Sequence, residues 1–287
     1  MRVALFFDEG PGAGLGHRRR MEALAAELGT RGHECRLRAL PPDDVVPDGV
    51  VVVDSYRVRA DNGLFAPARV IGAVDDLARD LAVDLVVDPS PGALGAAHRR
   101  ARRVLAGASY ALVPAPPAGV VEAAVDGPVA RVLVTTGAAD ADGVGARIAG
   151  ALRATGIESE IRLVVGPWGA AGVPEGVVAV HSPDGLASEL AAASVVVTAG
   201  GVALLEACLL GRPIVALALA ENQRQAVFGL EREGAVTAAT PEAVPDVVGT
   251  LLADRSRRIE LANAARSAID GKGPTRVVDV LEQLVSR

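Results

Sequence analysis

The chain has 287 residues, enough for two domains of ordinary size, and half of the residues are hydrophobic although only 2% are aromatic. Cores poor in aromatic side chains consist of Val, Leu, Ala and Ile, which is typical of buried parallel strands covered by helices. The net charge of −6 argues against a general nucleic-acid binder, whose affinity depends on a basic surface. No apolar run predicts a signal peptide or a membrane span, and Cys35 and Cys208 lack metal-ligand spacing. We therefore expect a cytoplasmic α/β protein.

The N-terminal stretch combines an apolar run, a glycine-rich turn and the start of a helix. Residues 3–7 predict a buried strand, and the apolar spacing of residues 18–28 predicts a helix. Free backbone N–H groups and the helix dipole at such a junction favour an anionic ligand. Gly14, Gly16 and His17 stand at this turn, but neither the dinucleotide fingerprint nor the P-loop is present. A histidine beside an anion site can exchange a proton near neutral pH, so His17 is a candidate catalytic residue.

The next apolar runs, at residues 49–54, 69–74 and 84–87, predict strands that close on acidic or small polar side chains. These closing residues are Asp54 with Ser55 and Tyr56, Asp75 with Asp76, and Asp88 with Ser90. The order of strand, polar residues and helix has the spacing of βαβ units. Because ligands of open parallel sheets bind beyond the carboxyl ends of the strands, these loops are predicted to border one cleft.

A stretch rich in proline and glycine at residues 114–128 is interpreted as an interdomain linker, after which the pattern of strands and helices resumes. The predicted domains are residues 1–117 and residues 118–287, and the second includes the C-terminal helices. Asp140 and Asp142 superficially match a D-x-D metal motif. Their place just before a helix is better explained by helix capping.

The most distinctive stretch of the C-terminal half is a strand at residues 195–198 that runs into Gly200 and Gly201 and then into a helix. Gly201 lets the backbone approach a phosphate, and Glu206 on the second turn can accept hydrogen bonds from two ribose hydroxyls. The Glu-Asn-Gln run at residues 221–223, after the next strand, is rich in groups that recognise polar ligands. This combination predicts a nucleotide site.

Several motifs together resemble the PseG family of nucleotide-sugar hydrolases, of the pseudaminic acid pathway, within the MurG-like GT-B superfamily. They are Asp8 with Gly16-His17 and Arg20, Val53-Asp54-Ser55-Tyr56, Val74-Asp75-Asp76-Leu77-Ala78, residues 105–112, residues 132–137, Gly200-Gly201 with Glu206, and Glu221-Asn222-Gln223. The resemblance implies a GT-B fold, in which two Rossmann-like domains face each other across a cleft. It also implies nucleotide bound by the C-terminal domain, sugar against the N-terminal domain, no metal or other cofactor, and His17 as the base that activates water.

The chain departs from the family pattern at three places. Ala138 stands where the family usually has a second glycine, Val202 and Ala203 stand where it has Ser or Thr, and Asp88 precedes Pro89-Ser90 where it has Asn. The sugar and the nucleotide base are therefore left open.

The predicted site divides into catalytic, nucleotide-binding and sugar-binding residues. The catalytic ones are His17, Asp8 and Tyr56, the nucleotide-binding ones are Gly137, Gly200, Gly201, Val202, Glu206, Asn222 and Gln223, and the sugar-binding ones are Gly14, Gly16, Arg20 and Glu221. Neutral His17 would take a proton from water as it attacks the anomeric carbon, and N–H groups after the glycine pair would stabilise the leaving diphosphate. Asp8 and Tyr56 would orient the sugar or the His17 tautomer, or simply cap strand ends.

The main functional hypothesis is a metal-independent, inverting hydrolase of a nucleoside-diphosphate sugar, with UDP as the expected nucleotide. The alternative is a GT-B glycosyltransferase in which His17 deprotonates a sugar or aglycone hydroxyl; a chain of 287 residues leaves little room for a large acceptor site, which favours water. A non-catalytic nucleotide-sugar-binding protein is the third possibility, suggested by the departures in the glycine motifs. The expected partner is the small-molecule substrate, with no nucleic acid, and the oligomeric state is left open.

Overall fold

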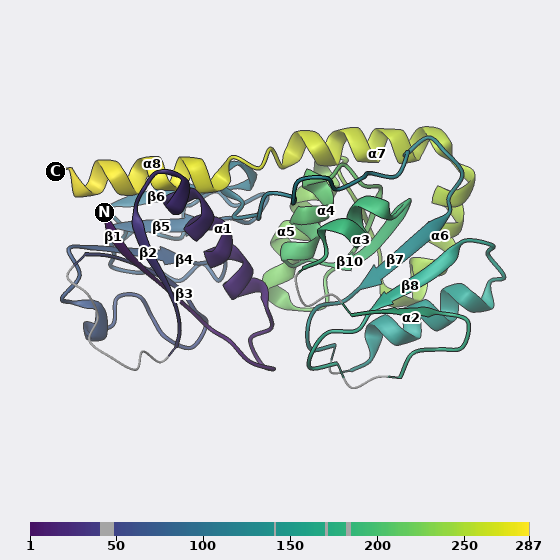
Figure 1. Ribbon diagram of the computed structural model, residues 1–287, viewed down its shortest axis with the longest axis horizontal. Helices are drawn as coiled ribbons and strands as arrows, with labels where there is room; N and C mark the ends of the chain where they lie inside the picture. The colour runs from purple at the N-terminus through teal and green to yellow at the C-terminus, as the bar shows by residue number, and fades with distance from the viewer. Residues whose placement is uncertain (41–48, 141, 170–171, 182–184, 287) are drawn as a thin grey trace. The chain divides into compact units, whose positions relative to one another are not determined.

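The structure is a computed structural model that describes residues 1–40, 49–140, 142–169, 172–181 and 185–286. It divides into two compact units, Met1–Ala115 with Gly271–Arg287, and Pro116–Asp270 (Figure 1). The first boundary lies close to the one predicted between residues 117 and 118. The residues from Gly271 onward differ from the prediction, because they belong to the first unit and not to the C-terminal domain.

The first unit contains a six-stranded parallel sheet with the order β2-β1-β3-β4-β5-β6. The strands are β1 (Arg2–Phe7), β2 (Glu34–Ala39), β3 (Val50–Asp54), β4 (Val70–Val74), β5 (Leu85–Asp88) and β6 (Arg103–Ala106). The order reverses between β1 and β3, because β2 lies on one side of β1 and all later strands lie on the other. Ligands of open parallel sheets bind at this reversal, beyond the carboxyl ends of the strands.

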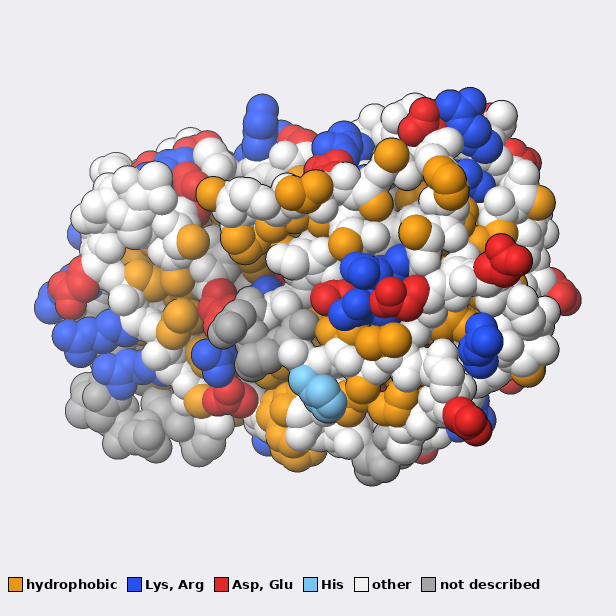
Figure 2. Space-filling view, turned by 45° about the vertical axis from the view of Figure 1, so that its right-hand side comes forward, with side chains coloured by type: hydrophobic (Ala, Val, Ile, Leu, Met, Phe, Trp, Pro, Cys, Tyr) orange, Lys and Arg blue, Asp and Glu red, His pale blue; other side chains and the backbone are white. Residues whose placement is uncertain are grey.

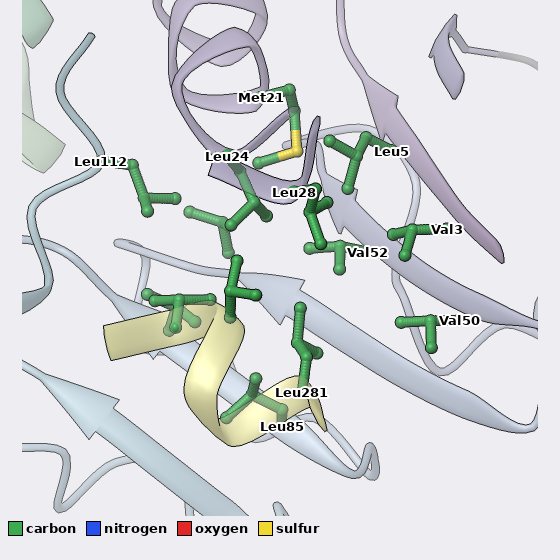
Figure 3. Packing of buried hydrophobic residues seen from close by; sticks show 14 of the residues in the cluster. Val3, Leu5, Met21, Leu24, Leu28, Val50, Val52, Leu85, Leu112 and Leu281 are labelled. Atoms are coloured by element: carbon green, nitrogen blue, oxygen red, sulfur yellow. The ribbon is translucent and has the colours of Figure 1, made fainter. Parts of the chain in front are cut away.

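Two helices, α1 (Gly16–Thr30) and α8 (Gly273–Val285), cover one face of this sheet. Met21, Leu24 and Leu28 recur at helical spacing on α1 and point toward the strands, and Leu281 of α8 joins the same cluster (Figure 3). These side chains are fully buried. The amphipathic C-terminal helix therefore packs on the first unit because it completes this apolar layer.

The connections after β3, β4 and β5 contain no α-helix among the described residues, whereas the sequence pattern predicts βαβ units there. The connection after β3 contains Asn62, Gly63 and Pro67, which favour turns over a long helix. It instead forms a short 3₁₀ helix, Gly63–Phe65, and places Phe65 against Phe6 on the opposite face of the sheet. Loops and α8 thus cover the sheet in place of the expected crossover helices.

His33 joins three parts of the first unit that are distant in sequence. The Met1 ammonium group donates to its Nδ1 over 3.0 Å, and its Nε2–H donates to Oε1 of Glu282 on α8 over 2.8 Å. Glu282 also accepts from Arg31 at 3.0 Å. These contacts hold the C-terminal helix to the N-terminus and to the turn before β2.

We expect His33→Ala to lower the free energy of unfolding by about 1 kcal/mol, because it breaks two hydrogen bonds that are only partly shielded from water. Urea denaturation followed by circular dichroism measures the change. His181→Ala, at an exposed histidine of the second unit, is the matched control. Equal midpoints for the two variants would contradict the role given to His33.

The second unit contains a parallel sheet with the order β12-β11-β10-β7-β8-β9. Its strands are β7 (Arg131–Thr135), β8 (Glu160–Val164), β9 (Val178–Val180), β10 (Val195–Ala199), β11 (Ile214–Leu217) and β12 (Thr237–Ala238). Its helices are α2 (Val144–Ala154), α3 (Ala187–Ala192), α4 (Val202–Leu209), α5 (Glu221–Arg232), α6 (Val244–Ala253) and α7 (Arg255–Ala268). This is the strand order of a dinucleotide-binding Rossmann sheet, and it reverses between β7 and β10.

Much of the predicted linker belongs to the second unit. The backbone N–H of Ala123 donates to the carbonyl of Ala191 over 2.8 Å, and the buried Arg212 donates to the carbonyl of Ala123 over 2.8 Å. Residues from Pro116 onward are therefore part of the second compact unit. Within the described ranges, no helix is both long and apolar enough to cross a membrane.

Surface charges occur in mixed groups, and Figure 2 shows acidic and basic side chains next to one another in several places. Arg255, for example, pairs with Asp126 over 2.8 Å, and both side chains are more than half exposed. Exposed ion pairs each contribute at most about 1 kcal/mol to stability. Each unit is stabilised mainly by its own apolar core and not by these pairs.

Candidate active site

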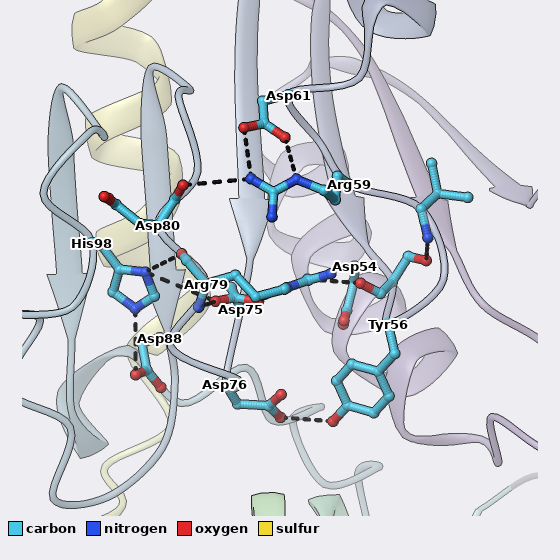
Figure 4. A network of polar contacts seen from close by, with 12 residues as sticks. Asp54, Tyr56, Arg59, Asp61, Asp75, Asp76, Arg79, Asp80, Asp88 and His98 are labelled. Carbon is cyan, nitrogen blue, oxygen red and sulfur yellow. Dashed lines mark hydrogen bonds and ion pairs between the residues drawn. The ribbon is translucent and has the colours of Figure 1, made fainter.

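Aspartates stand at the carboxyl ends of four neighbouring strands of the first sheet. Asp8 follows β1, Asp54 ends β3, Asp75 and Asp76 follow β4, and Asp88 ends β5. All five side chains are at least nine-tenths buried, so each needs donors or cations around it. Figure 4 shows four of them, Asp54, Asp75, Asp76 and Asp88, within one polar network.

His17 lies in the first turn of α1 and is 2% exposed. Its Nδ1 lies 2.6 Å from Oδ1 of Asp54, which is 1% exposed. Without a proton between them, two lone pairs would face each other at this distance, so we assign Nδ1–H as the donor to the carboxylate. Among the described residues, Nε2 has no hydrogen-bond partner in the structure, and its lone pair can accept a proton.

The pairing of β1 with β3 brings His17 and Asp54 together. Phe7, at the end of β1, lies opposite Asp54 in the parallel register. The glycine turn after β1 leads into α1 at Gly16, which returns over the same end of the sheet. The two side chains therefore meet at the point where the strand order reverses, which is the ligand-binding point of this class of sheet.

Arg20, one turn after His17 on α1, is buried and bonded to two carboxylates. Nε donates to Oδ2 of Asp54 over 2.7 Å, Nη2 donates to Oδ1 of Asp54 over 2.8 Å, and Nη1 donates to Oδ2 of Asp76 over 2.8 Å. Burial opposes its charge, but Asp54 and Asp76 raise the pKa of the guanidinium well above its usual value. The guanidinium of Arg20, which is predicted to bind the sugar, thus donates its hydrogen bonds to carboxylates of the protein.

Tyr56 borders the imidazole of His17. The two rings meet edge to face with their centroids 4.4 Å apart, and the Tyr56 hydroxyl donates to Oδ2 of Asp76 over 3.0 Å. Burial and then the neighbouring Asp76 raise the pKa of this hydroxyl, so it stays protonated and serves as a donor. The structure thus places Tyr56 against His17, and the catalytic role of Tyr56 stays a prediction.

Asp8 forms its hydrogen bonds with the loop after β3 and not with His17. Its carboxylate accepts from the hydroxyl of Ser55 over 2.9 Å and from the backbone N–H of Tyr56 over 2.9 Å. These bonds cap the loop after β3 and fix the backbone that carries Tyr56. The partner of His17 is Asp54, which the sequence placed in a family motif but not among the candidate catalytic residues.

A second histidine, His98, is buried near the ends of β4 and β5 (Figure 4). Its Nδ1–H donates to the carbonyl of Arg79 over 3.1 Å, and its Nε2 lies 3.7 Å from Oδ2 of Asp88. Arg79 in turn pairs with Asp75. Burial raises the pKa of Asp88. Sequence reasoning missed His98, because an arginine-rich run such as residues 99–103 indicates an exposed loop.

The glycines of the first loop shape the entry to α1. Gly14 has a φ of +71°, which a residue with a Cβ adopts with strain, and its N–H donates to the carbonyl of Gly10 over 3.0 Å. Gly16 is the first residue of α1. Their assignment to sugar binding stays a prediction.

In the second unit, the glycine loops lie at the reversal of the strand order. Gly137 follows β7 with a φ of +109°, and Gly200 and Gly201 join β10 to α4, which starts at Val202. A Cβ on Gly200 would lie 2.7 Å from Val227 and 2.8 Å from Gln223, whereas one on Gly201 would meet nothing within 4 Å. Gly201 thus leaves the N-terminal end of α4 open, and Gly200 allows α5 to pack closely.

The remaining predicted nucleotide residues lie on α4 and α5. Glu206 on α4 is 7% exposed, so only a small part of it can reach a ligand. Asn222 and Gln223 lie in the first turn of α5, where the Gln223 side chain accepts from the N–H of Leu219 over 2.9 Å. Glu221 is exposed at the start of the same helix. The structure brings the glycine pair next to α5, and the nucleotide roles stay predictions.

Asp140 accepts a hydrogen bond from the N–H of Gly145 in the first turn of α2 over 3.1 Å. This bond satisfies one N–H of the first turn, whereas the N-cap position itself is Gly143 and makes no side-chain bond. In the part of the chain that the structure describes, no group of three or more His, Cys, Asp or Glu side chains is placed to hold a metal ion.

We expect Gly200→Ala to destabilise the second unit by about 1–3 kcal/mol, because its Cβ would press on α5. Gly201→Ala is the matched control, because the added Cβ has no neighbouring atom within 4 Å. The Gly201→Ala variant should unfold at the same urea concentration as the wild type. If Gly201 borders the phosphates, Gly201→Ala weakens the binding of UDP or dTDP measured by titration calorimetry. Equal stability of the two variants would contradict the packing argument.

No protein-family model matches the sequence, and the search of curated proteins finds no match. Solved structures are similar over nearly the whole chain. MurG of Acinetobacter baumannii has a TM-score of 0.62 at 15% identity and covers 99% of this chain and 100% of its own. The spinosyn rhamnosyltransferase SpnG complexed with thymidine diphosphate has a TM-score of 0.63 at 20% identity, covering 98% and 100%. The calicheamicin glycosyltransferase CalG4 has a TM-score of 0.64 at 17% identity, covering 100% and 99%.

These likenesses, together with two parallel six-stranded sheets flanked by helices, identify the fold as GT-B, as the sequence predicts. The similar structures are MurG and glycosyltransferases. At this level of identity the likeness defines the architecture, and the activity has to be argued from the site.

Proposed function

We propose that this protein is an inverting enzyme that transfers a sugar from a nucleoside diphosphate to an acceptor hydroxyl. The observation that carries the proposal is the buried His17–Asp54 pair at the strand reversal of the first sheet. The similar structures include glycosyltransferases, one of them complexed with thymidine diphosphate. They favour transfer over the hydrolysis that the sequence motifs favour.

In the proposed reaction, the acceptor oxygen attacks the anomeric carbon from the side opposite the diphosphate. A new carbon–oxygen bond forms as the bond to the diphosphate oxygen breaks, and its electron pair leaves with the diphosphate. The hydroxyl proton moves to Nε2 of His17, and Asp54 stabilises the resulting imidazolium through Nδ1–H. The attack from the opposite side inverts the configuration at the anomeric carbon.

The second unit would supply the nucleotide site. The open backbone at Gly201 and the N-terminus of α4 offer N–H groups and the positive end of a helix dipole, which stabilise a leaving diphosphate. The polar start of α5, with Asn222, stands next to the glycine pair and supports recognition of the nucleoside.

Hydrolysis is the second candidate, with water in place of the acceptor, and the motif resemblance to PseG-type hydrolases supports it. Chain length no longer favours water, because this chain covers 100% of the rhamnosyltransferase SpnG and 99% of the glycosyltransferase CalG4. The His17–Asp54 pair can activate either oxygen.

The deciding experiment is incubation with a panel of UDP- and dTDP-sugars, with and without hydroxyl acceptors, while NDP release and the anomer formed are followed. Release that requires an acceptor supports the transferase, and release in water alone identifies a hydrolase. Binding of a nucleotide sugar without any release would overturn both and identify a non-catalytic binding protein.

A further inference from the structure

Arg20 closes a ring of side chains around the imidazole of His17. His17 bonds to Asp54, Asp54 to Arg20, Arg20 to Asp76 and Asp76 to Tyr56, whose ring returns to the edge of His17. These side chains come from α1, the end of β3 and the loops after β3 and β4. Arg20 is the member that contacts both carboxylates.

The geometry of Arg20 leaves little of it for a ligand. Its side chain is only 9% exposed, and Nε, Nη1 and Nη2 each donate to a protein carboxylate at 2.7 or 2.8 Å. Nη2 also lies 3.1 Å from Nδ1 of His17, so the guanidinium packs directly beside the imidazole. A planar guanidinium can hold both oxygens of Asp54 and one of Asp76 at once, which a lysine ammonium cannot do.

The charges of the ring explain why a cation is needed at this position. Asp54 and Asp76 are both about nine-tenths buried or more, and two buried carboxylates that contact the same guanidinium repel each other. Burial opposes ionisation of Asp76, but Arg20 holds its pKa below the usual range. Without Arg20, the Asp54 carboxylate would lose the two bonds that fix its orientation toward His17.

We propose that Arg20 is a positioning residue of the proposed reaction and not a ligand of the sugar. It fixes Asp54 against Nδ1 of His17 and, through Asp76, fixes Tyr56 against the ring, so that Nε2 is held in one direction. This inference rests on the proposed function for its kinetic consequence, while the positioning itself can be observed without turnover.

The first test is kinetic and uses Arg20→Lys and Arg20→Gln. Both variants are expected to lower kcat by about 10- to 100-fold, because the general base is still present but is no longer held in the correct orientation. The KM for the nucleotide sugar should stay within about threefold of the wild-type value. Arg18→Gln, at an exposed arginine of the same helix, is the matched control and should change neither value. A large rise in KM with an unchanged kcat would show that Arg20 binds the sugar, and unchanged values would show that it has no role.

The second test does not depend on activity. In protein with ¹⁵N-labelled histidine, the Nδ1–H of His17 held by Asp54 should give a downfield proton resonance, assigned by its loss in His17→Ala. The resonance should broaden or disappear in Arg20→Lys and persist in Arg18→Gln. If both substitutions at Arg20 prevent folding, Asp76→Asn removes the charge that accepts from Arg20 and Tyr56. It leaves both bonds between Arg20 and Asp54 and should weaken the resonance partly.

Persistence of the resonance in every folded variant of Arg20 or Asp76 would overturn the positioning role. Absence of NDP release from the wild type, with the resonance pattern as expected, would overturn the proposed reaction alone. The two failures are therefore distinguishable.

Discussion

His17→Ala is expected to lower the rate of NDP release by about 100- to 10,000-fold, which is the usual contribution of a general base. The substitution removes Nε2, the group that accepts the proton, while the bidentate contact between Arg20 and Asp54 can stay in place. The measurement is kcat with the best nucleotide sugar and acceptor found in the panel. The KM for the nucleotide sugar should change little, because the second unit supplies the nucleotide site in the proposed function.

His181→Ala serves as the control, since it deletes the same side chain from the exposed surface of the second unit. A circular dichroism spectrum equal to that of the wild type checks that the His17 variant is folded. An NDP release rate that survives in folded His17→Ala would remove His17 as the base, whatever the acceptor is.

Asp54→Asn is the second change for which we expect a large effect, a fall in kcat of about 1,000-fold or more. The amide can donate to Nδ1 of His17, which favours the tautomer that carries the proton on Nε2. In that tautomer Nε2 has no lone pair to accept a proton from the acceptor hydroxyl. The substitution also weakens the bidentate contact with Arg20.

Asp61→Asn is the matched control for this prediction. Asp61 belongs to the same polar network, where it pairs with Arg59 over 2.9 Å (Figure 4). Asp61 accepts hydrogen bonds from Arg59 and from the N–H of Ala82, and among the described residues it bonds to neither His17 nor Arg20. If Asp54→Asn retains the kcat of this control, the His17–Asp54 pair does not act as a unit.

Some features of the fold follow from local patterns in the sequence, and others do not. Runs of Val, Leu and Ile at the predicted places became the buried parallel strands, because burial on both faces requires continuous apolar residues. The helices expected after β3 and β5 did not form, since turn-forming residues such as Gly63 and Gly92 interrupt those connections. The sequence of the C-terminal helix does not indicate which of the two units it packs on, because an amphipathic helix can cover any apolar face of matching size.

The sequence by itself determined the two parallel sheets, the glycine loops at their strand ends and His17 as the candidate base, because each depends on neighbours along the chain. The tertiary structure alone decided the partner of His17. Asp54 is separated from it by more than thirty residues, and the parallel register of β1 and β3 brings the two side chains to 2.6 Å. It also decided that Arg20 bonds to two carboxylates, because buried charges take the partners that the fold places within reach.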